Sequence, residues 1–182
     1  MKKVFALIFA LMMLCCSAVA LAEEKVDIDI DGLVTVSITL PEGYEAGTYA
    51  ESGSLAAVII PADGDENKVG FILLIAPDEE YADLERLNDL DDEALAAYEQ
   101  SFIEDLFAPT VTHTETEHGT KLFIIDENDS EYDMVEIATL YKGYNMVIYL
   151  DYSDGRTVTE ADIAAGVKIF SNLALIWPET VA

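Results

Sequence analysis

The amino-acid sequence predicts an α+β domain in which helices pack on an antiparallel β-sheet. Strand-like segments follow one another through short turns, as they do in antiparallel hairpins. Two helix-like segments, each with one apolar face, stand apart from these strands in the sequence. No internal repeat or polar linker interrupts the pattern, so residues 23–182 are expected to form a single domain.

The first part of this domain is expected to contain strands joined by turns, with a less regular stretch after Pro41 that passes through Gly47 and Gly53. Residues 26–30 alternate apolar and acidic side chains, turn at Asp31-Gly32, and continue as a second strand over 33–40. A short apolar segment follows at 55–60, and a polar turn occupies 63–67. The segment 69–76 is nearly continuously apolar, which indicates a central strand covered on both faces.

Two helices are expected after these strands. The first is weak over 81–87 and stronger over 92–107, where apolar residues recur at steps of three or four and Asp91 can cap the N-terminus. The second starts after Thr159, which has capping-box spacing to Asp162, and its apolar stripe continues to Trp177. Both helices are expected to lie on the sheet.

Four strands are expected between the two helices. Residues 110–117 are polar enough to form an edge strand, which turns at His118-Gly119 into 121–125. After the acidic loop 126–133, a hairpin of 134–141 and 144–152 follows. Its second strand is apolar on both faces and is therefore expected at the centre of the sheet.

Three short segments are shared with a known superfamily. They are Leu-Pro-Glu-Gly-Tyr at 40–44, Gly-Thr-Lys at 119–121 and Ile-Phe-Ser-Asn-Leu at 169–173. In these segments and in its order of elements the chain resembles the PsbP-like α/β sandwich superfamily, which includes extrinsic photosystem II subunits and many small exported bacterial proteins. The resemblance spans nearly all of 23–182. It implies a PsbP-like α-β sandwich and an accessory or binding role, and it assigns no functional residue.

The first 22 residues are typical of a secretory signal peptide. Lys2 and Lys3 precede an apolar run over 4–14, and small residues then lead to cleavage after Ala22, with a cut two residues earlier as the alternative. The run is shorter than the roughly 20 residues of a membrane span, so a secreted or extracytoplasmic protein without a transmembrane anchor is expected. Cys15 and Cys16 do not follow a small residue, so a lipid anchor is not expected.

The expected mature chain is very acidic. The whole chain has 36 acidic and nine basic residues and a formal net charge of -27, which becomes -29 when Lys2 and Lys3 are removed. Such a charge repels nucleic acid and anionic lipid, and it attracts cations and basic peptides. Nucleic acid is therefore excluded as an expected partner.

Clustered carboxylates are the only candidates for metal binding, and calcium is the only cofactor that they bring into consideration. Asp27, Asp29 and Asp31 match the start of a calcium loop, but its twelfth position would be Ile38 instead of glutamate. The two acidic loops offer better-placed oxygens. They contain Asp63, Asp65 and Glu66 in one case, and Asp126, Glu127, Asp129 and Glu131 in the other.

Motifs for catalysis are not found in the sequence. His113 and His118 are five positions apart, which would place them on opposite faces of a strand, and no Gly-x-Ser-x-Gly elbow is present. No catalytic residue is predicted. Five tyrosines around the last hairpin are instead the candidate ligand-binding residues, although tyrosines in strands also serve ordinary packing. They are Tyr132, Tyr141, Tyr144, Tyr149 and Tyr152.

The sequence therefore predicts an exported, non-enzymatic binding or accessory protein that acts outside the cytoplasmic membrane on a protein or envelope component that it does not identify. Contact would be made by the tyrosine-bearing sheet face or by the acidic surface. Two alternatives stay open: a calcium-binding surface protein, and a hydrolase with dispersed acidic catalytic residues.

Overall fold

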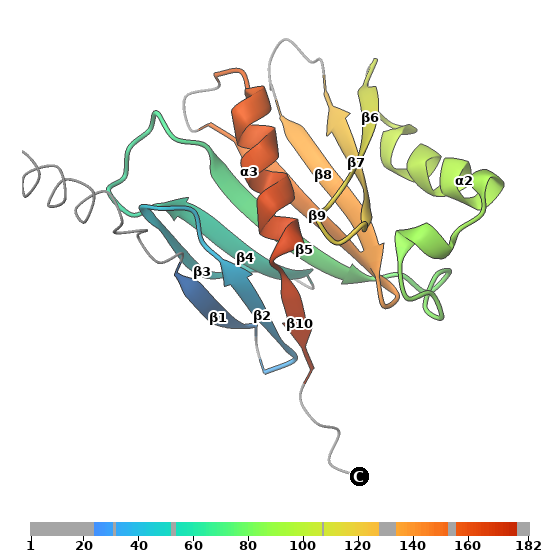
Figure 1. Ribbon diagram of the computed structural model, residues 1–182, viewed down its shortest axis with the longest axis horizontal. Helices are drawn as coiled ribbons and strands as arrows, with labels where there is room; N and C mark the ends of the chain where they lie inside the picture. The colour runs from blue at the N-terminus through green and yellow to red at the C-terminus, as the bar shows by residue number, and fades with distance from the viewer. Residues whose placement is uncertain are drawn as a thin grey trace, which may run out of the picture.

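The computed structural model describes residues 24–30, 32–51, 54–106, 108–127, 134–152 and 156–177. Within them, ten strands form two antiparallel sheets and two α-helices pack on the larger sheet, which confirms the predicted α+β class (Figure 1). The predicted signal peptide, residues 1–22, lies outside the described residues.

The smaller sheet has three strands in the order β1-β2-β10. Its strands are β1 (Lys25–Ile30), β2 (Val34–Thr39) and β10 (Ala174–Ile176). The predicted first hairpin is confirmed, since Lys25 pairs with Thr39 and Ile30 with Val34. Gly32 sits in the connecting turn at φ +67°, a conformation that glycine adopts without steric cost.

The larger sheet has seven strands in the order β3-β4-β5-β9-β8-β7-β6. As predicted, β9 is central and β6 is at an edge. The strands are β3 (Tyr44–Glu51), β4 (Ser54–Pro61), β5 (Gly70–Pro77), β6 (Thr110–Glu115), β7 (Lys121–Asp126), β8 (Val135–Tyr141) and β9 (Tyr144–Asp151).

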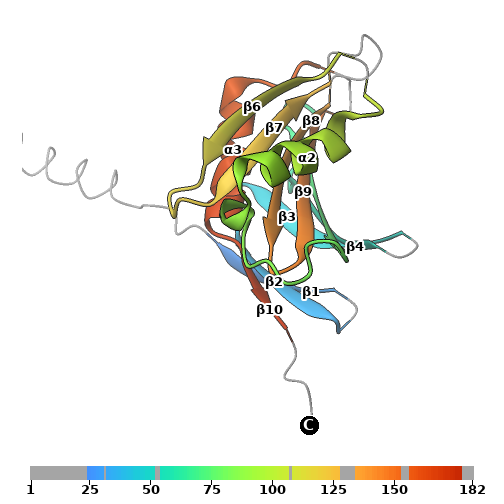
Figure 2. The same ribbon diagram turned by 90° about the vertical axis from the view of Figure 1, so that its right-hand side faces the viewer.

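The two faces of this larger sheet are covered differently. The front face, which includes Leu73, Ile137 and Ile148, packs on α3 (Glu160–Ser171) and on the smaller sheet. The back face, which includes Ala138 and Val147, packs on α2 (Asp92–Ile103). Figure 2 shows α2 in front of the sheet with α3 behind it. Neither described helix is long and apolar enough to cross a membrane.

Both predicted helix caps are confirmed. Asp91 accepts a hydrogen bond from the Ala94 amide at 2.9 Å. Thr159 and Asp162 form the capping box of α3, where the Asp162 carboxylate accepts from the Thr159 amide at 2.9 Å. These bonds satisfy amide groups that the first turn of a helix leaves without a partner.

Three predicted boundaries are wrong. The last helix ends at Ser171, and the segment after it forms β10, in which Leu175 lies opposite Val36 of β2. Side chains at 173, 175 and 177 are half-buried while those at 174 and 176 are exposed, so the apolar residues follow the period of a strand. Residues 81–87 form turns that lead into the short 3-10 helix η1 (Leu87–Asp89), and α2 ends at Ile103.

The expectation that residues 69–76 are covered on both faces is also wrong. β5 lies between β4 and β9 as a central strand, but Ile72 on its back face is 36% exposed. The reason is that α2 covers the back face over β7 and β8, near the edge of the sheet that is opposite β3 and β4. The back face of β4 and β5 therefore has none of the described helices over it.

Candidate functional site

The predicted tyrosines do not form one surface. Tyr141 and Tyr144 lie opposite each other in the β8-β9 hairpin, on the front face. Tyr152 is buried at the other end of β9, where its hydroxyl donates to Asp162 at 2.9 Å, and Tyr149 lies on the back face. Tyr132 is outside the described residues. The structure thus brings together only Tyr141 and Tyr144.

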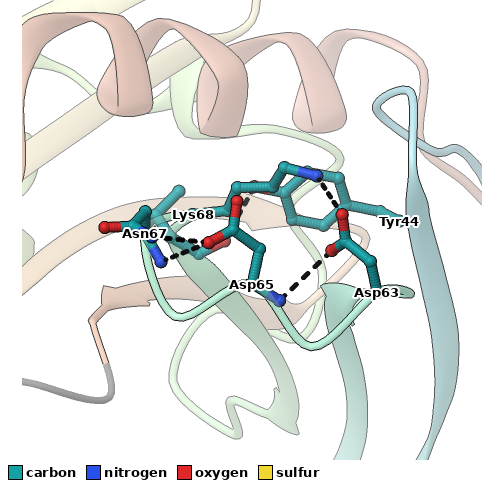
Figure 3. Close-up of polar contacts among 6 residues, drawn as sticks. Tyr44, Asp63, Asp65, Asn67 and Lys68 are labelled. Carbon is teal, nitrogen blue, oxygen red and sulfur yellow. Dashed lines mark hydrogen bonds and ion pairs between the residues drawn. The ribbon is translucent and has the colours of Figure 1, made fainter.

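In the acidic loop between β4 and β5, the Asp63 and Asp65 carboxylates interact with other groups of the same loop (Figure 3). One Asp63 oxygen pairs with Lys68 Nζ at 3.0 Å, and the other accepts from the Asp65 amide at 3.2 Å. Asp65 accepts from the amide and the side chain of Asn67, at 3.0 and 2.7 Å. These hydrogen bonds hold the pKa of both carboxyl groups below the usual range.

The remaining predicted metal ligands are not drawn together in the part of the chain that the structure describes. Glu66 contributes its carbonyl oxygen to a hydrogen bond from Arg156. Asp126 ends β7 and is paired with Val135 of β8, while Asp129 lies outside the described residues. No group of three or more His, Cys, Asp or Glu side chains that could hold a metal ion occurs among the described residues.

The front face instead contains a pocket of about 440 Å³ at the C-terminal end of α3. Its floor is apolar and its walls carry three threonines, so we call it the threonine pocket. The lining residues are Glu85, Arg86, Thr116, His118, Thr120, Leu122, Thr139, Tyr141, Met146, Phe170, Ser171 and Leu173.

One wall of the threonine pocket is the turn between β6 and β7. The buried Thr116 hydroxyl accepts from the amides of His118 at 3.3 Å and Thr120 at 3.1 Å, and Gly119 takes the positive φ that the turn requires. This arrangement fixes His118 and Thr120 at the pocket. It is a local consequence of the Thr-Glu-His-Gly-Thr sequence at 116–120.

The opposite wall comes from the segment that precedes η1. Asn88 holds this segment to the β6-β7 turn, because its amide donates to Gly119 O at 2.9 Å and its oxygen accepts from the Lys121 amide at 3.0 Å. Arg86 forms a backbone bridge with Tyr141, and the Lys142 amide donates to Glu85 O at 2.9 Å. The side chain of Asn88 therefore places Arg86 near His118 across 32 residues of sequence.

The end of α3 closes the pocket from a third direction. The Ser171 hydroxyl donates to Val167 O at 3.0 Å and accepts from the Glu117 amide at 3.4 Å. Thr139 of β8, another lining residue, donates to Lys121 O at 2.8 Å. The Ser171 and Thr139 hydroxyl groups therefore already have hydrogen-bond partners within the protein.

Other polar groups of the threonine pocket have no such partner. The side chains of His118, Thr120 and Tyr141 form no hydrogen bond with another described residue, and Arg86 forms no ion pair with a described carboxylate. Ligand sites typically combine an apolar lining with a few polar groups that are free to fix the ligand. The threonine pocket has both.

A second pocket, of about 500 Å³, lies between α3 and the turn at 40–44. Its lining includes one cation, Lys168, together with Glu24 and Glu42. The Tyr44 hydroxyl in its wall already donates to Val69 O at 3.0 Å. Because the Tyr44 hydroxyl and Lys168 already have partners in the fold, the threonine pocket is the better candidate.

A buried carboxyl group with a raised pKa lies on the back face. Burial first, and then the charge of the neighbouring Glu127, raise the pKa of Glu136 to about 7. Glu136 is 8% exposed and lies beside Tyr149 of β9 and Ile125 of β7. The sheet separates it from the threonine pocket, to which it contributes no atom.

Sequence reasoning missed most of the threonine pocket. Of the predicted ligand-binding residues it contains only Tyr141. Arg86 carries no local signal beyond being one of few bases, and the expected turn at His118-Gly119 is confirmed but does not by itself indicate a ligand site. No local signal could connect them, because the side chain of Asn88 forms that connection.

Comparison with known proteins adds no assignment. No protein-family model matches the sequence, and a search of curated proteins finds no match.

Proposed function

We propose that this protein is an exported, non-enzymatic binding or accessory protein that holds a small ligand in the threonine pocket. The observation that carries this proposal is the combination of an apolar floor with rim side chains that form no hydrogen bond or ion pair with another described residue, namely Arg86, His118, Thr120 and Tyr141. The volume, about 440 Å³, falls within the usual range for small-molecule sites.

A role without catalysis is favoured by where the reactive groups lie. Catalytic acids and bases are expected inside a cleft, where burial tunes their pKa toward neutrality. Here the described carboxyl group with a pKa near 7, Glu136, is on the back face, away from the pocket. Neither Thr139 nor Ser171 in the pocket is hydrogen-bonded to a base, as an activated nucleophile would be.

The proposal includes export and the resemblance to the PsbP-like superfamily. Cleavage after Ala22 would release a chain that starts at Glu23 and acts outside the cytoplasmic membrane. The segments 119–121 and 169–173, on which the resemblance rests in part, both border the threonine pocket. A binding role at this position agrees with the accessory roles of that superfamily.

Two measurements test the proposal. Mass spectrometry of the protein recovered outside the cytoplasm of the exporting cell should show Glu23 as the first residue. Amide NMR spectra of that protein, recorded with a library of small organic molecules, should show shifts that cluster at 116–122 and 170–173.

A blocking variant makes the second measurement specific. Thr120→Trp places an indole in the pocket and should abolish the clustered shifts, whereas Thr112→Trp on exposed β6 should retain them. Shifts that cluster elsewhere, or that survive in Thr120→Trp, would contradict a ligand site in this pocket. Hydrolysis of a library compound by the wild-type protein would contradict the non-enzymatic role.

A further inference from the structure

We infer that the ligand of the threonine pocket is a small, largely apolar organic acid whose carboxylate is bound by Arg86. This inference rests on the proposed function and adds the chemical class of the ligand. It is drawn from the distribution of positive charge, from the groups that face Arg86, and from the lining of the pocket.

Positive charge is scarce in this protein. The chain has nine Lys and Arg residues against 36 Asp and Glu, and two of the nine are in the predicted leader. Two cations are used in structural contacts: Lys68 pairs with Asp63 at 3.0 Å, and Arg156 donates to Asn67 and Glu66. A cation that lines a pocket without such a contact keeps its charge available to a ligand.

Two cations of this kind meet at the threonine pocket. Arg86 lines it, and Lys142 lies 5.4 Å from the centre of the Tyr141 ring, which also lines it. Neither forms an ion pair with a described carboxylate. The pocket thus has one cation in its lining, and a second lies beside Tyr141, on a strongly acidic protein.

The groups around Arg86 suit a carboxylate better than other anions. A guanidinium presents two parallel N–H donors that match the two oxygens of a carboxylate. The Thr120 and Tyr141 hydroxyls and the His118 ring are further potential donors around the same opening. Glu85 at the same rim contributes one negative charge, which would be more unfavourable for a doubly charged phosphate than for a single carboxylate.

The floor indicates the nature of the remainder of the ligand. Leu122, Met146 and Phe170 are buried, and Leu173 is half-buried beside them. Apolar groups of a ligand gain by displacing water from such a surface, while the exposed Arg86 at the rim is accessible to its carboxylate. The site therefore favours an acid with a compact hydrocarbon body over a polyhydroxylated sugar acid.

Ligands that differ only in their polar group test this inference. Benzoate, benzamide and benzamidine share one ring and carry a negative, zero and positive charge, and hexanoate with hexanamide repeats the comparison for an aliphatic body. Dissociation constants for the exported protein should favour at least one carboxylate over its amide by about tenfold, the effect of one charge-assisted hydrogen bond. Benzamidine should bind more weakly than benzoate.

Matched variants assign the preference to Arg86. Arg86→Gln should reduce it to about twofold or less, while Lys68→Gln removes the same charge elsewhere and should retain it. Glu85→Gln should tighten carboxylate binding by about threefold, because it removes a repelling charge from the rim. An Arg86→Gln protein with unchanged melting temperature shows that the lost preference does not come from unfolding.

The outcomes separate this inference from the proposed function. If amides bind as tightly as acids and Thr120→Trp blocks both, the pocket is a ligand site and the organic-acid inference is overturned. The same conclusion follows if Arg86→Gln keeps the preference for acids. If no compound of either kind shifts residues of the threonine pocket, the proposed function itself is contradicted.

Discussion

The two faces of the seven-stranded sheet obtain their stability in different ways. The front face is apolar and is closed by α3 and the smaller sheet, so its stability depends on shape and volume. The back face combines apolar packing under α2 with buried or half-buried polar groups, namely Glu136, Tyr98 and Asn145. Its stability depends on protonation and hydrogen bonds as well as volume. The four predictions below test this difference.

Adjacent isoleucines of β4 provide the largest contrast. Ile59 points to the front face and is 0% exposed, whereas Ile60 points to the open part of the back face and is 44% exposed. Ile59→Ala should lower the free energy of unfolding by about 4 kcal/mol, because it leaves a cavity in a close-packed core. Ile60→Ala should cost less than about 1 kcal/mol. Urea unfolding measures both, and equal losses would contradict the assignment of the faces.

Glu136 should make the back face sensitive to pH. The pKa of Glu136 is raised to about 7 in the folded protein, so this carboxyl group ionises at lower pH in the unfolded chain than in the folded one. The free energy of unfolding therefore falls as the pH rises toward 7. Glu136→Gln should therefore increase the free energy of unfolding by about 3 kcal/mol at pH 8 and change it little at pH 4. Unfolding of both proteins at the two pH values measures this difference.

Glu45→Gln is the control for Glu136→Gln. Glu45 is exposed on β3, and its substitution changes the net charge by the same amount. If Glu45→Gln stabilised the protein at pH 8 as much as Glu136→Gln, the cause would be the general excess of negative charge. The local environment of Glu136 would then not be responsible.

The polar network under α2 should contribute a smaller amount. The Tyr98 hydroxyl donates to Asn145 Oδ1 at 2.6 Å, and the Asn145 amide donates to Asp78 at 2.8 Å. Tyr98→Phe should lower the free energy of unfolding by about 1.5 kcal/mol, because it leaves the Asn145 oxygen without a donor. Tyr81→Phe, in a ring that packs edge-on against Tyr98, is the matched control and should have little effect. Thermal unfolding should separate the two variants.

The close approach of α3 to the front face at Gly166 should give the smallest effect. A Cβ at Gly166 of α3 would lie 2.6 Å from Cδ1 of Ile137, an atom that valine lacks. Gly166→Ala should therefore be more favourable in an Ile137→Val background than in wild type, by about 1 kcal/mol, because the clash that opposes alanine in wild type is absent there. A double-mutant cycle measures this coupling, and strictly additive effects would contradict it.

The threonine pocket shows how far local patterns reach. The turn at His118-Gly119 and the hairpin that contains Tyr141 were predictable, because each depends on neighbouring residues. Their approach to Arg86 was not, because it depends on the side chain of Asn88 and on the position of β6 and β7 in the sheet. Because three separated segments form the pocket, no one of them contains a sequence pattern that predicts it.

The sequence by itself determined the α+β class, the β1-β2, β6-β7 and β8-β9 hairpins, the central position of β9 and both helix caps, but not β3. These features follow from the period of apolar residues and from turn and cap residues, which act over a few positions of the chain. Only the tertiary structure decided that α2 and α3 take opposite faces, that residues 174–176 form a strand, and that Arg86 and His118 border one pocket. The physical reason is that each of these depends on which surface a segment meets, and therefore on contacts between residues far apart in the sequence.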